Sequence, residues 1–156
     1  MSTVIFYLLA GDVEDSRQRF ACKLAGDYCY NQSRTHILVP NQEYLEKIDE
    51  MLWQYPIERF VPHEVLAGTS ARCLVTLSCT SQFNGTGDVL INATDSIPVI
   101  AGQFSKICEI VLGNERPLAR ERFRQYRSQD FELFHEEHDE ETEIGDSPTK
   151  SSLEET

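Results

Sequence analysis

Five arginines lie close together near the carboxyl-terminal end of the chain. Residues 116–127 read RPLARERFRQYR, although the 156 residues include only 14 Lys and Arg and carry a formal net charge of -12. On a helix with about 100° of rotation per residue, four of these arginines fall within an arc of about 80°. These four, which we call the arginine stripe, are Arg116, Arg120, Arg124 and Arg127.

A row of guanidinium groups on a helix has one structural interpretation and three functional ones. Phe123 lies beside the stripe on the helical projection, and Arg122 falls on the other side. The stripe is a solvated helix face above a core of aromatic residues, or it binds nucleic-acid phosphates, phosphorylated ligands or an acidic peptide. The peptide would place its carboxylates on the guanidinium forks and an apolar end near Phe123.

A second candidate site is the segment WQYPIERFVP at residues 53–62. It contains three large aromatic residues, Trp53, Tyr55 and Phe60, in a connection bounded by prolines. These rings either pack into the core or form a contact with another protein, since aromatic residues dominate the energetics of protein interfaces.

The sequence has no motif for a nucleotide, a metal or a covalent catalyst. Backbone amides need glycines to approach a pyrophosphate, and Ala10-Gly11-Asp12 matches neither G-x-G-x-x-G nor G-K-[ST]. His135 and His138 are three residues apart, whereas H-E-x-x-H places its histidines four apart. No serine or cysteine has a base placed by a recognisable motif. We therefore expect no enzyme, no cofactor and no structural metal.

Runs of β-branched and aromatic residues predict the strands of a sheet. The predicted strands cover residues 3–9, 35–39, 73–79 and 88–92, and residues 105–112 form either a fifth strand or a buried helix. Helical patterns follow the first two strands, and the stripe lies on the last predicted helix. The order is typical of βαβ units, so we expect an α/β domain with a mostly parallel sheet of about five strands.

Three polar residues are predicted to cap these helices at their N-termini. Asp12 precedes the first helix, Asn41 the second and Asn114 the last, which also has Pro117 in its first turn. Pro56 is expected to end the second helix.

Most of the acidity lies at the carboxyl-terminal end. Residues 130–156 hold eleven acidic residues and one basic residue, Lys150. Such a composition is typical of disorder, so we expect a domain over residues 1–130 and an acidic, disordered tail over residues 131–156. The N-terminal segment MSTVIFYLLAGD lacks a basic region, and its apolar run is too short for a signal peptide or a membrane span. We expect a cytoplasmic protein with no membrane contact.

Four segments, in order along the chain, resemble the chi subunit family of bacterial DNA polymerase III. They are FYLL at 6–9, IDEMLWQYPIERFVPHEVLAG at 48–68, DVLIN at 88–92 and ARERFRQYR at 119–127. The resemblance covers about residues 3–130. It implies a Rossmann-like, three-layer fold without a nucleotide-binding loop, and a subunit that catalyses nothing.

The resemblance also implies partners and the residues that bind them. Chi proteins bind the acidic C-terminal tail of single-stranded DNA-binding protein, and here the matching positions are Arg120 and Phe123, surrounded by Arg116, Arg124 and Arg127. Where relatives often have a tyrosine, this chain has Phe123. Val111 and Leu112 are candidates for the apolar wall of that pocket.

Chi proteins also bind the psi subunit, which links them to the clamp loader. The resemblance assigns this surface to Phe60 with Trp53 nearby, and a functional substitute for psi, such as a helicase, is a further candidate. DNA is then reached only indirectly. The alternative function is an α/β protein that binds nucleic acid directly through its arginine-rich last helix, which the charge of the acidic tail opposes.

Overall fold

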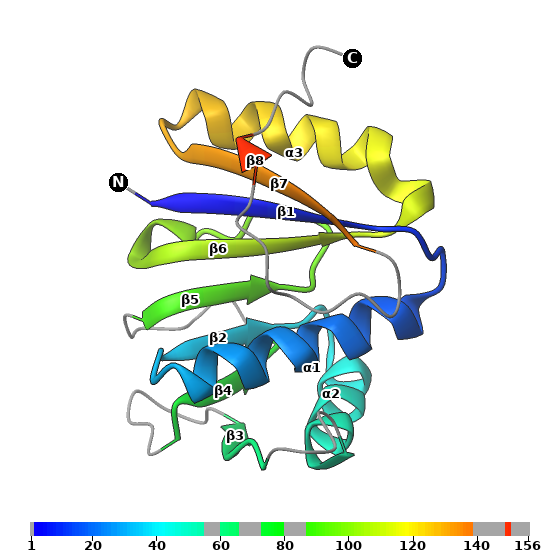
Figure 1. The fold of residues 1–156 in the computed structure, drawn as a ribbon, viewed down its shortest axis with the longest axis vertical. Coiled ribbons are helices and arrows are strands. Elements are labelled where there is room, and N and C mark those ends of the chain that lie inside the picture. The colour runs from blue at the N-terminus through cyan, green and yellow to red at the C-terminus, as the bar shows by residue number, and fades with distance from the viewer. Residues whose placement is uncertain (1, 55–59, 66–72, 80–86, 139–148, 151–156) are drawn as a thin grey trace.

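The computed structural model describes residues 2–54, 60–65, 73–79, 87–138 and 149–150. Eight strands, three α-helices and two 3-10 helices lie within these residues (Figure 1). The strands are β1 Thr3–Leu9, β2 Thr35–Leu38, β3 His63–Val65, β4 Val75–Ser78, β5 Gly87–Asn92, β6 Phe104–Val111, β7 Glu132–His138 and β8 Thr149–Lys150. The helices are α1 Glu14–Tyr30, α2 Gln42–Gln54 and α3 Arg116–Ser128, and the 3-10 helices are η1 Ala101–Gln103 and η2 Gly113–Glu115.

The strands form one sheet in the order β3-β4-β2-β5-β6-β1-β7-β8. Every neighbouring pair is parallel except β7 and β8, which are antiparallel. The expected α/β class and mostly parallel sheet are therefore confirmed. The expected number of strands was too low, because β3, β7 and β8 were not predicted.

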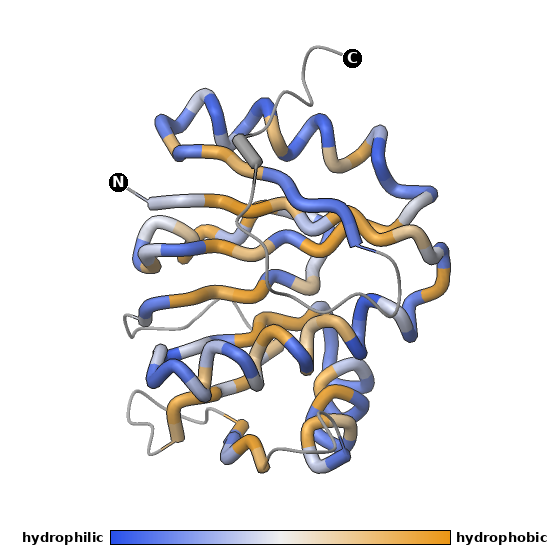
Figure 2. The backbone as a smooth tube through the Cα atoms, viewed as in Figure 1, coloured by the Kyte–Doolittle hydropathy of each residue, from blue (hydrophilic) through white to orange (hydrophobic). Residues whose placement is uncertain are grey.

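Helices cover both faces of the sheet, which gives the expected three layers. Side chains of β1 alternate between two apolar clusters, as a strand buried on both faces requires. Ile5 and Tyr7 pack with residues of α1 and α2, whereas Val4 and Phe6 pack with residues of α3. Figure 2 shows that the central strands are mainly hydrophobic and that α3 is mainly hydrophilic.

The segment beyond Asp130 departs from the expectation of a disordered tail. Residues Glu132–His138 form β7, which pairs in parallel with β1 from Thr3 to Leu9. The folded domain therefore extends at least to His138, past the predicted boundary at residue 130. β8 pairs with β7 through Phe134↔Lys150 and His135↔Thr149. The rest of the predicted tail, residues 139–148 and 151–156, lies outside the described residues.

Local predictions had mixed outcomes. The ambiguous segment at 105–112 is a strand, β6, because it pairs with both β1 and β5. Asn41 does cap α2: its Oδ1 accepts a hydrogen bond from the backbone N–H of Tyr44 at 2.8 Å. Asp12 is not a cap, since the N-cap position of α1 is Val13, and Asn114 lies inside η2 rather than at the start of α3. Pro117 is in the first turn of α3, as expected.

No helix among the described residues is long and apolar enough to cross a membrane.

Candidate functional site

The arginine stripe lies on α3, which follows β6 and η2 and packs beside β7 (Figure 1). Ala119, Phe123 and Tyr126 are buried and attach the helix to the sheet. Arg124 and Arg127 are exposed, and Arg116 and Arg120 are half-buried at the edge of the packed face. The four guanidinium-bearing residues therefore share one side of α3, as the helical projection predicted.

Two residues of the stripe have weak acidic partners at the surface. Arg116 Nη1 lies 3.4 Å from Glu137 Oε1 of β7, and Arg124 Nη1 lies 3.4 Å from Glu121 Oε2 of the same helix. Exposed pairs of this length are worth only about 0–1 kcal/mol. An acidic ligand can therefore displace them at little cost.

Arg120 lies between these two pairs. Its Nε is a buried donor with no hydrogen-bond partner among the residues that the structure describes. A buried N–H without an acceptor is unfavourable. The described part of the protein therefore leaves at least one donor of Arg120 unsatisfied.

Phe123 is part of the core rather than an exposed ring. Its side chain is 2% exposed, and its ring centroid lies 5.8 Å from that of Phe6 on β1. Val111 and Leu112, the candidates for an apolar wall, are also buried. The apolar side chain that α3 exposes is Leu118, 66% exposed, which the sequence did not single out.

Beneath the stripe, α3 is attached to a buried carboxylate on β6. Glu109 is 1% exposed, and its Oε1 accepts a hydrogen bond from Arg122 Nε at 3.2 Å. Its Oε2 accepts from Tyr126 Oη at 2.7 Å and from Asn92 Nδ2 at 2.7 Å. Burial raises the pKa of Glu109, and the charge of Arg122 and these hydrogen bonds oppose that shift. We call these four residues the Glu109 network.

The second candidate surface lies at the β3 edge of the sheet. Trp53, near the end of α2, is 63% exposed, and Phe60 is 70% exposed. Their ring centroids are 5.8 Å apart, and the ring of Trp53 lies 4.8 Å from that of His63. Val65 of β3 adds a side chain that is 46% exposed. The core interpretation is therefore wrong for Trp53 and Phe60, whereas Tyr55 lies outside the described residues.

His63 holds this aromatic group in place. Its Nδ1 is 2.8 Å from the carbonyl oxygen of Val61, and its Nε2 is 2.9 Å from Asp49 Oδ1 on α2. Large aromatic residues are enriched in protein interfaces. We call Trp53, Phe60 and Val65 the aromatic patch.

The arginine stripe and the aromatic patch lie far apart. The strand order places β3 near one edge of the sheet and β7 near the other, with five strands between them. Figure 1 shows α3 beside β7 and β1, and α2 beside β3 and β4. Two ligands can therefore bind without touching each other.

The histidines of the predicted tail belong to β7. His138 is buried, with its ring centroid 5.8 Å from that of Tyr7 and 5.1 Å from that of Phe20. Residues three apart on a strand point to opposite faces, so His135 and His138 do not face one site. Within the described ranges, no group of three or more His, Cys, Asp or Glu is arranged to hold a metal ion.

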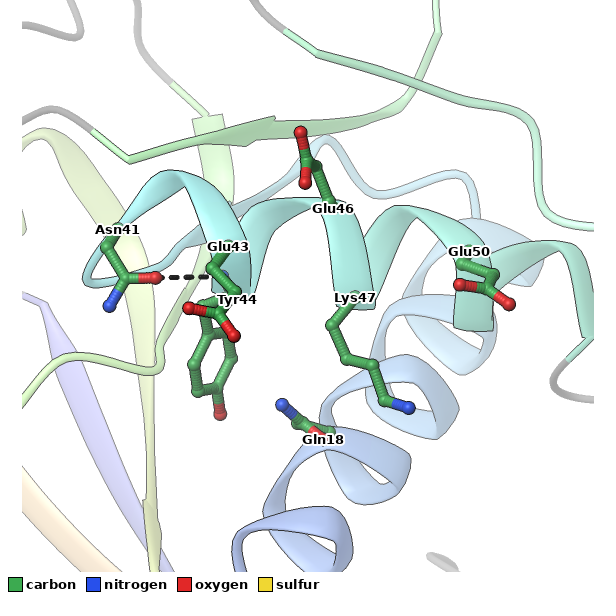
Figure 3. A pocket seen from close by; sticks show the side chains of 7 residues that line it. All are labelled: Gln18, Asn41, Glu43, Tyr44, Glu46, Lys47 and Glu50. Carbon is green, nitrogen blue, oxygen red and sulfur yellow. Dashed lines mark hydrogen bonds between the residues drawn. The ribbon is translucent and has the colours of Figure 1, made fainter.

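An open pocket of about 430 Å³ lies between α1 and α2 (Figure 3). It is lined by Gln18, Asn41, Glu43, Tyr44, Glu46, Lys47 and Glu50. Figure 3 shows Glu46 directed away from Gln18 and Tyr44, so the carboxylates do not converge on one point. The pocket shares no residue with the arginine stripe or the aromatic patch.

The fold and its two surfaces define a Rossmann-like α/β protein without a glycine-rich loop after its first strand. The family model described as "DNA polymerase III chi subunit, HolC" matches residues 1–134. The chain therefore belongs to the chi subunit family of DNA polymerase III, whose members are accessory subunits of the replicative polymerase.

Three curated relatives support this assignment, and each is named DNA polymerase III subunit chi. The chain is 30% identical to the protein from Pseudomonas aeruginosa over 135 residues, which cover 85% of this chain and 94% of the relative. It is 28% identical to the Escherichia coli K12 protein over 142 residues, covering 85% and 96%. It is 29% identical to the Haemophilus influenzae protein over 135 residues, covering 84% and 94%.

Proposed function

We propose that this chi-family protein is a non-catalytic adaptor of DNA polymerase III in the cytoplasm. The arginine stripe binds the acidic C-terminal tail of single-stranded DNA-binding protein, and the aromatic patch binds the psi subunit or a functional substitute. The observation that carries the proposal is the stripe itself: four arginines on one side of a helix whose adjacent side is fixed to the sheet.

The chemistry of the stripe suits an acidic peptide with a free terminal carboxylate. Guanidinium groups bind carboxylates through paired, charge-assisted hydrogen bonds, each worth roughly 1.5–3 kcal/mol. Arg120 has the unsatisfied Nε, and the weak partners of Arg116 and Arg124 are readily exchanged. We therefore assign Arg120 the central role, with Arg116, Arg124 and Arg127 around it and Phe123 supporting the helix from below.

The aromatic patch suits a partner with apolar side chains. Trp53 and Phe60 are both more than half exposed and lie ring to ring at 5.8 Å. Large aromatic residues that pack together on a surface are typical hot spots of protein association. Psi would link the protein to the clamp loader through this patch, and a helicase could use the same residues in its place.

Direct binding of nucleic acid remains the alternative for the stripe. Phosphates and carboxylates both pair with arginine, but a chain with a formal net charge of -12 repels a long polyanion more strongly than a short peptide.

A titration with two labelled ligands tests the proposal. The full chain is added to a fluorescent peptide with the sequence of the host's single-stranded DNA-binding protein tail, and separately to a naked DNA single strand of similar net charge. The proposal expects saturable binding of the peptide and little binding of the naked strand. The opposite preference would support the nucleic-acid alternative.

A further inference from the structure

We infer that Glu109 is a positioning residue for the arginine stripe: through the Glu109 network, it fixes the rotation of α3 and so decides which arginines face the ligand. This inference deepens the proposed function and depends on it for its biological meaning.

The network attaches the helix at two points one turn apart. Arg122 and Tyr126 both lie on α3, and both donate hydrogen bonds to the single carboxylate of Glu109. On the helical projection both side chains are more than about 100° from the middle of the stripe. Two attachments to one fixed group on β6 restrict both the rotation of α3 about its axis and its sliding along that axis.

The apolar contacts of α3 are poorly suited to fix its rotation. Besides Tyr126, its buried apolar residues are Ala119 and Phe123. The hydrophobic effect is non-directional, whereas hydrogen bonds require defined distances and angles. Buried polar groups can thus specify one arrangement even where they add little net stability.

The exposure of the stripe depends on this rotation. Arg116 and Arg120 are half-buried, and on the helical projection Arg116 lies about 20° from the buried Phe123. A small rotation of α3 in one direction would bury Arg116 and Arg120 further, and a rotation in the other direction would expose them. The accessible set of arginines is therefore coupled to the position of Glu109.

Both carboxylate oxygens of Glu109 accept hydrogen bonds, which makes it a firm attachment. Asn92 of β5 donates to Glu109 Oε2, and the same Asn92 Nδ2 also donates to the carbonyl oxygen of Ser96 at 2.9 Å. Arg122 Nη1 donates to the carbonyl oxygen of Asp95 at 3.4 Å. The loop after β5 is thus tied to the same group as α3.

The test removes the network without leaving a buried charge unpaired. In the triple variant Glu109→Met, Arg122→Met, Tyr126→Phe, Asn92 keeps its bond to Ser96, and both charges are lost together. The control is Ile107→Val. It alters an apolar residue of β6 that packs in the same apolar cluster as Phe123 of α3, and it keeps the Glu109 network. Each full-length variant is first checked for cooperative unfolding.

Two measurements are then made on each folded variant. Modification by phenylglyoxal, an arginine-selective reagent, is followed for every arginine by peptide mass spectrometry. We expect the triple variant to change the rates of Arg116 and Arg120 relative to Arg124 several-fold, while Ile107→Val keeps the wild-type pattern. We also expect the triple variant to bind the acidic tail peptide about tenfold more weakly, a change of one unit in log Kd.

The outcomes separate the inference from the proposed function. An unchanged labelling pattern in a folded triple variant would overturn the positioning role of Glu109, even if wild type binds the peptide. A changed pattern with no peptide binding by wild type would support the positioning role and reject the proposed ligand. If the triple variant does not fold, the single variant Tyr126→Phe is labelled in its place. We then expect the same change in the relative labelling rates, but a smaller one.

Discussion

Arg116 of α3 and Glu137 of β7 form an ion pair across the edge of the arginine stripe, with 3.4 Å between Nη1 and Oε1. The two side chains are 39% and 68% exposed, so solvent screens their attraction. Glu137 belongs to β7, which lies in a segment whose composition alone predicts a disordered tail. It places a carboxylate of the protein where a carboxylate of the proposed ligand would bind.

This pair predicts that Glu137→Gln strengthens binding of the acidic tail peptide by about two- to threefold, the range expected for loss of a weak surface competitor. The matched control is Glu132→Gln, which removes the same charge from an exposed position at the other end of β7. Fluorescence anisotropy at low salt measures both affinities. Equal gains in the two variants would show that net charge, and not the pair with Arg116, sets the affinity.

Arg120→Ala should weaken peptide binding by about ten- to a hundredfold, because one charge-assisted hydrogen bond is worth roughly 1.5–3 kcal/mol. The control is Arg19→Ala on α1, where the arginine pairs with Asp15 at 2.8 Å. Isothermal titration calorimetry gives the affinities. Wild-type affinity in Arg120→Ala, or equal losses in both variants, would contradict the assigned site.

The two phenylalanines of the candidate sites should behave oppositely. Phe60→Ala should leave the free energy of unfolding nearly unchanged, because the ring is 70% exposed, and should impair binding of psi or its substitute. Phe123→Ala should lower the free energy of unfolding by about 3–5 kcal/mol, as truncation of a core aromatic usually does. Urea unfolding and a pull-down with psi measure the two effects. A large loss of stability in Phe60→Ala would place that ring in the core.

His36 predicts a pH dependence of stability. Its Nδ1 is 2.7 Å from Thr76 Oγ1 and its Nε2 is 2.8 Å from Ser78 Oγ, and burial lowers its pKa from 6.5 to about 4. Because the folded state holds the neutral ring, its contribution is complete above pH 6.5 and is lost as the pH falls toward 4.

The expected loss attributable to His36 is about 2 kcal/mol between pH 7.5 and pH 5, at 1.36 kcal/mol per pKa unit. Urea unfolding at both pH values, compared with His36→Gln, isolates this contribution because the carboxylates are common to both proteins. The variant should lose less stability than wild type over that interval. Equal losses would show that His36 does not titrate there.

Much of the fold could be predicted because parallel strands buried on both faces appear as continuous apolar runs. TVIFYLL of β1 is such a run. β7 was missed because its sequence, ELFHEEH, is dominated by polar residues, and its pairing with β1 is a long-range contact that local composition does not reveal. β3 has only three residues, too few for a pattern.

Part of the candidate site could also be predicted from a local sequence pattern. The stripe follows from helical periodicity alone. The burial of Phe123 does not, because its projected position lies at the margin between the packed and the exposed face, and only tertiary packing decides between them. Glu109 interrupts the apolar run of β6, which is a local signal of a buried charge, but its partners on α3 are 13 and 17 residues away.

The most direct test of the account is the affinity of the full-length protein for the C-terminal tail peptide of the host's single-stranded DNA-binding protein, measured across a salt series. The account predicts saturable binding that weakens as salt rises, because the stripe is partly exposed. Binding should also be lost when the terminal carboxylate of the peptide is amidated. No binding at low salt, or equal binding of the amidated peptide, would contradict it.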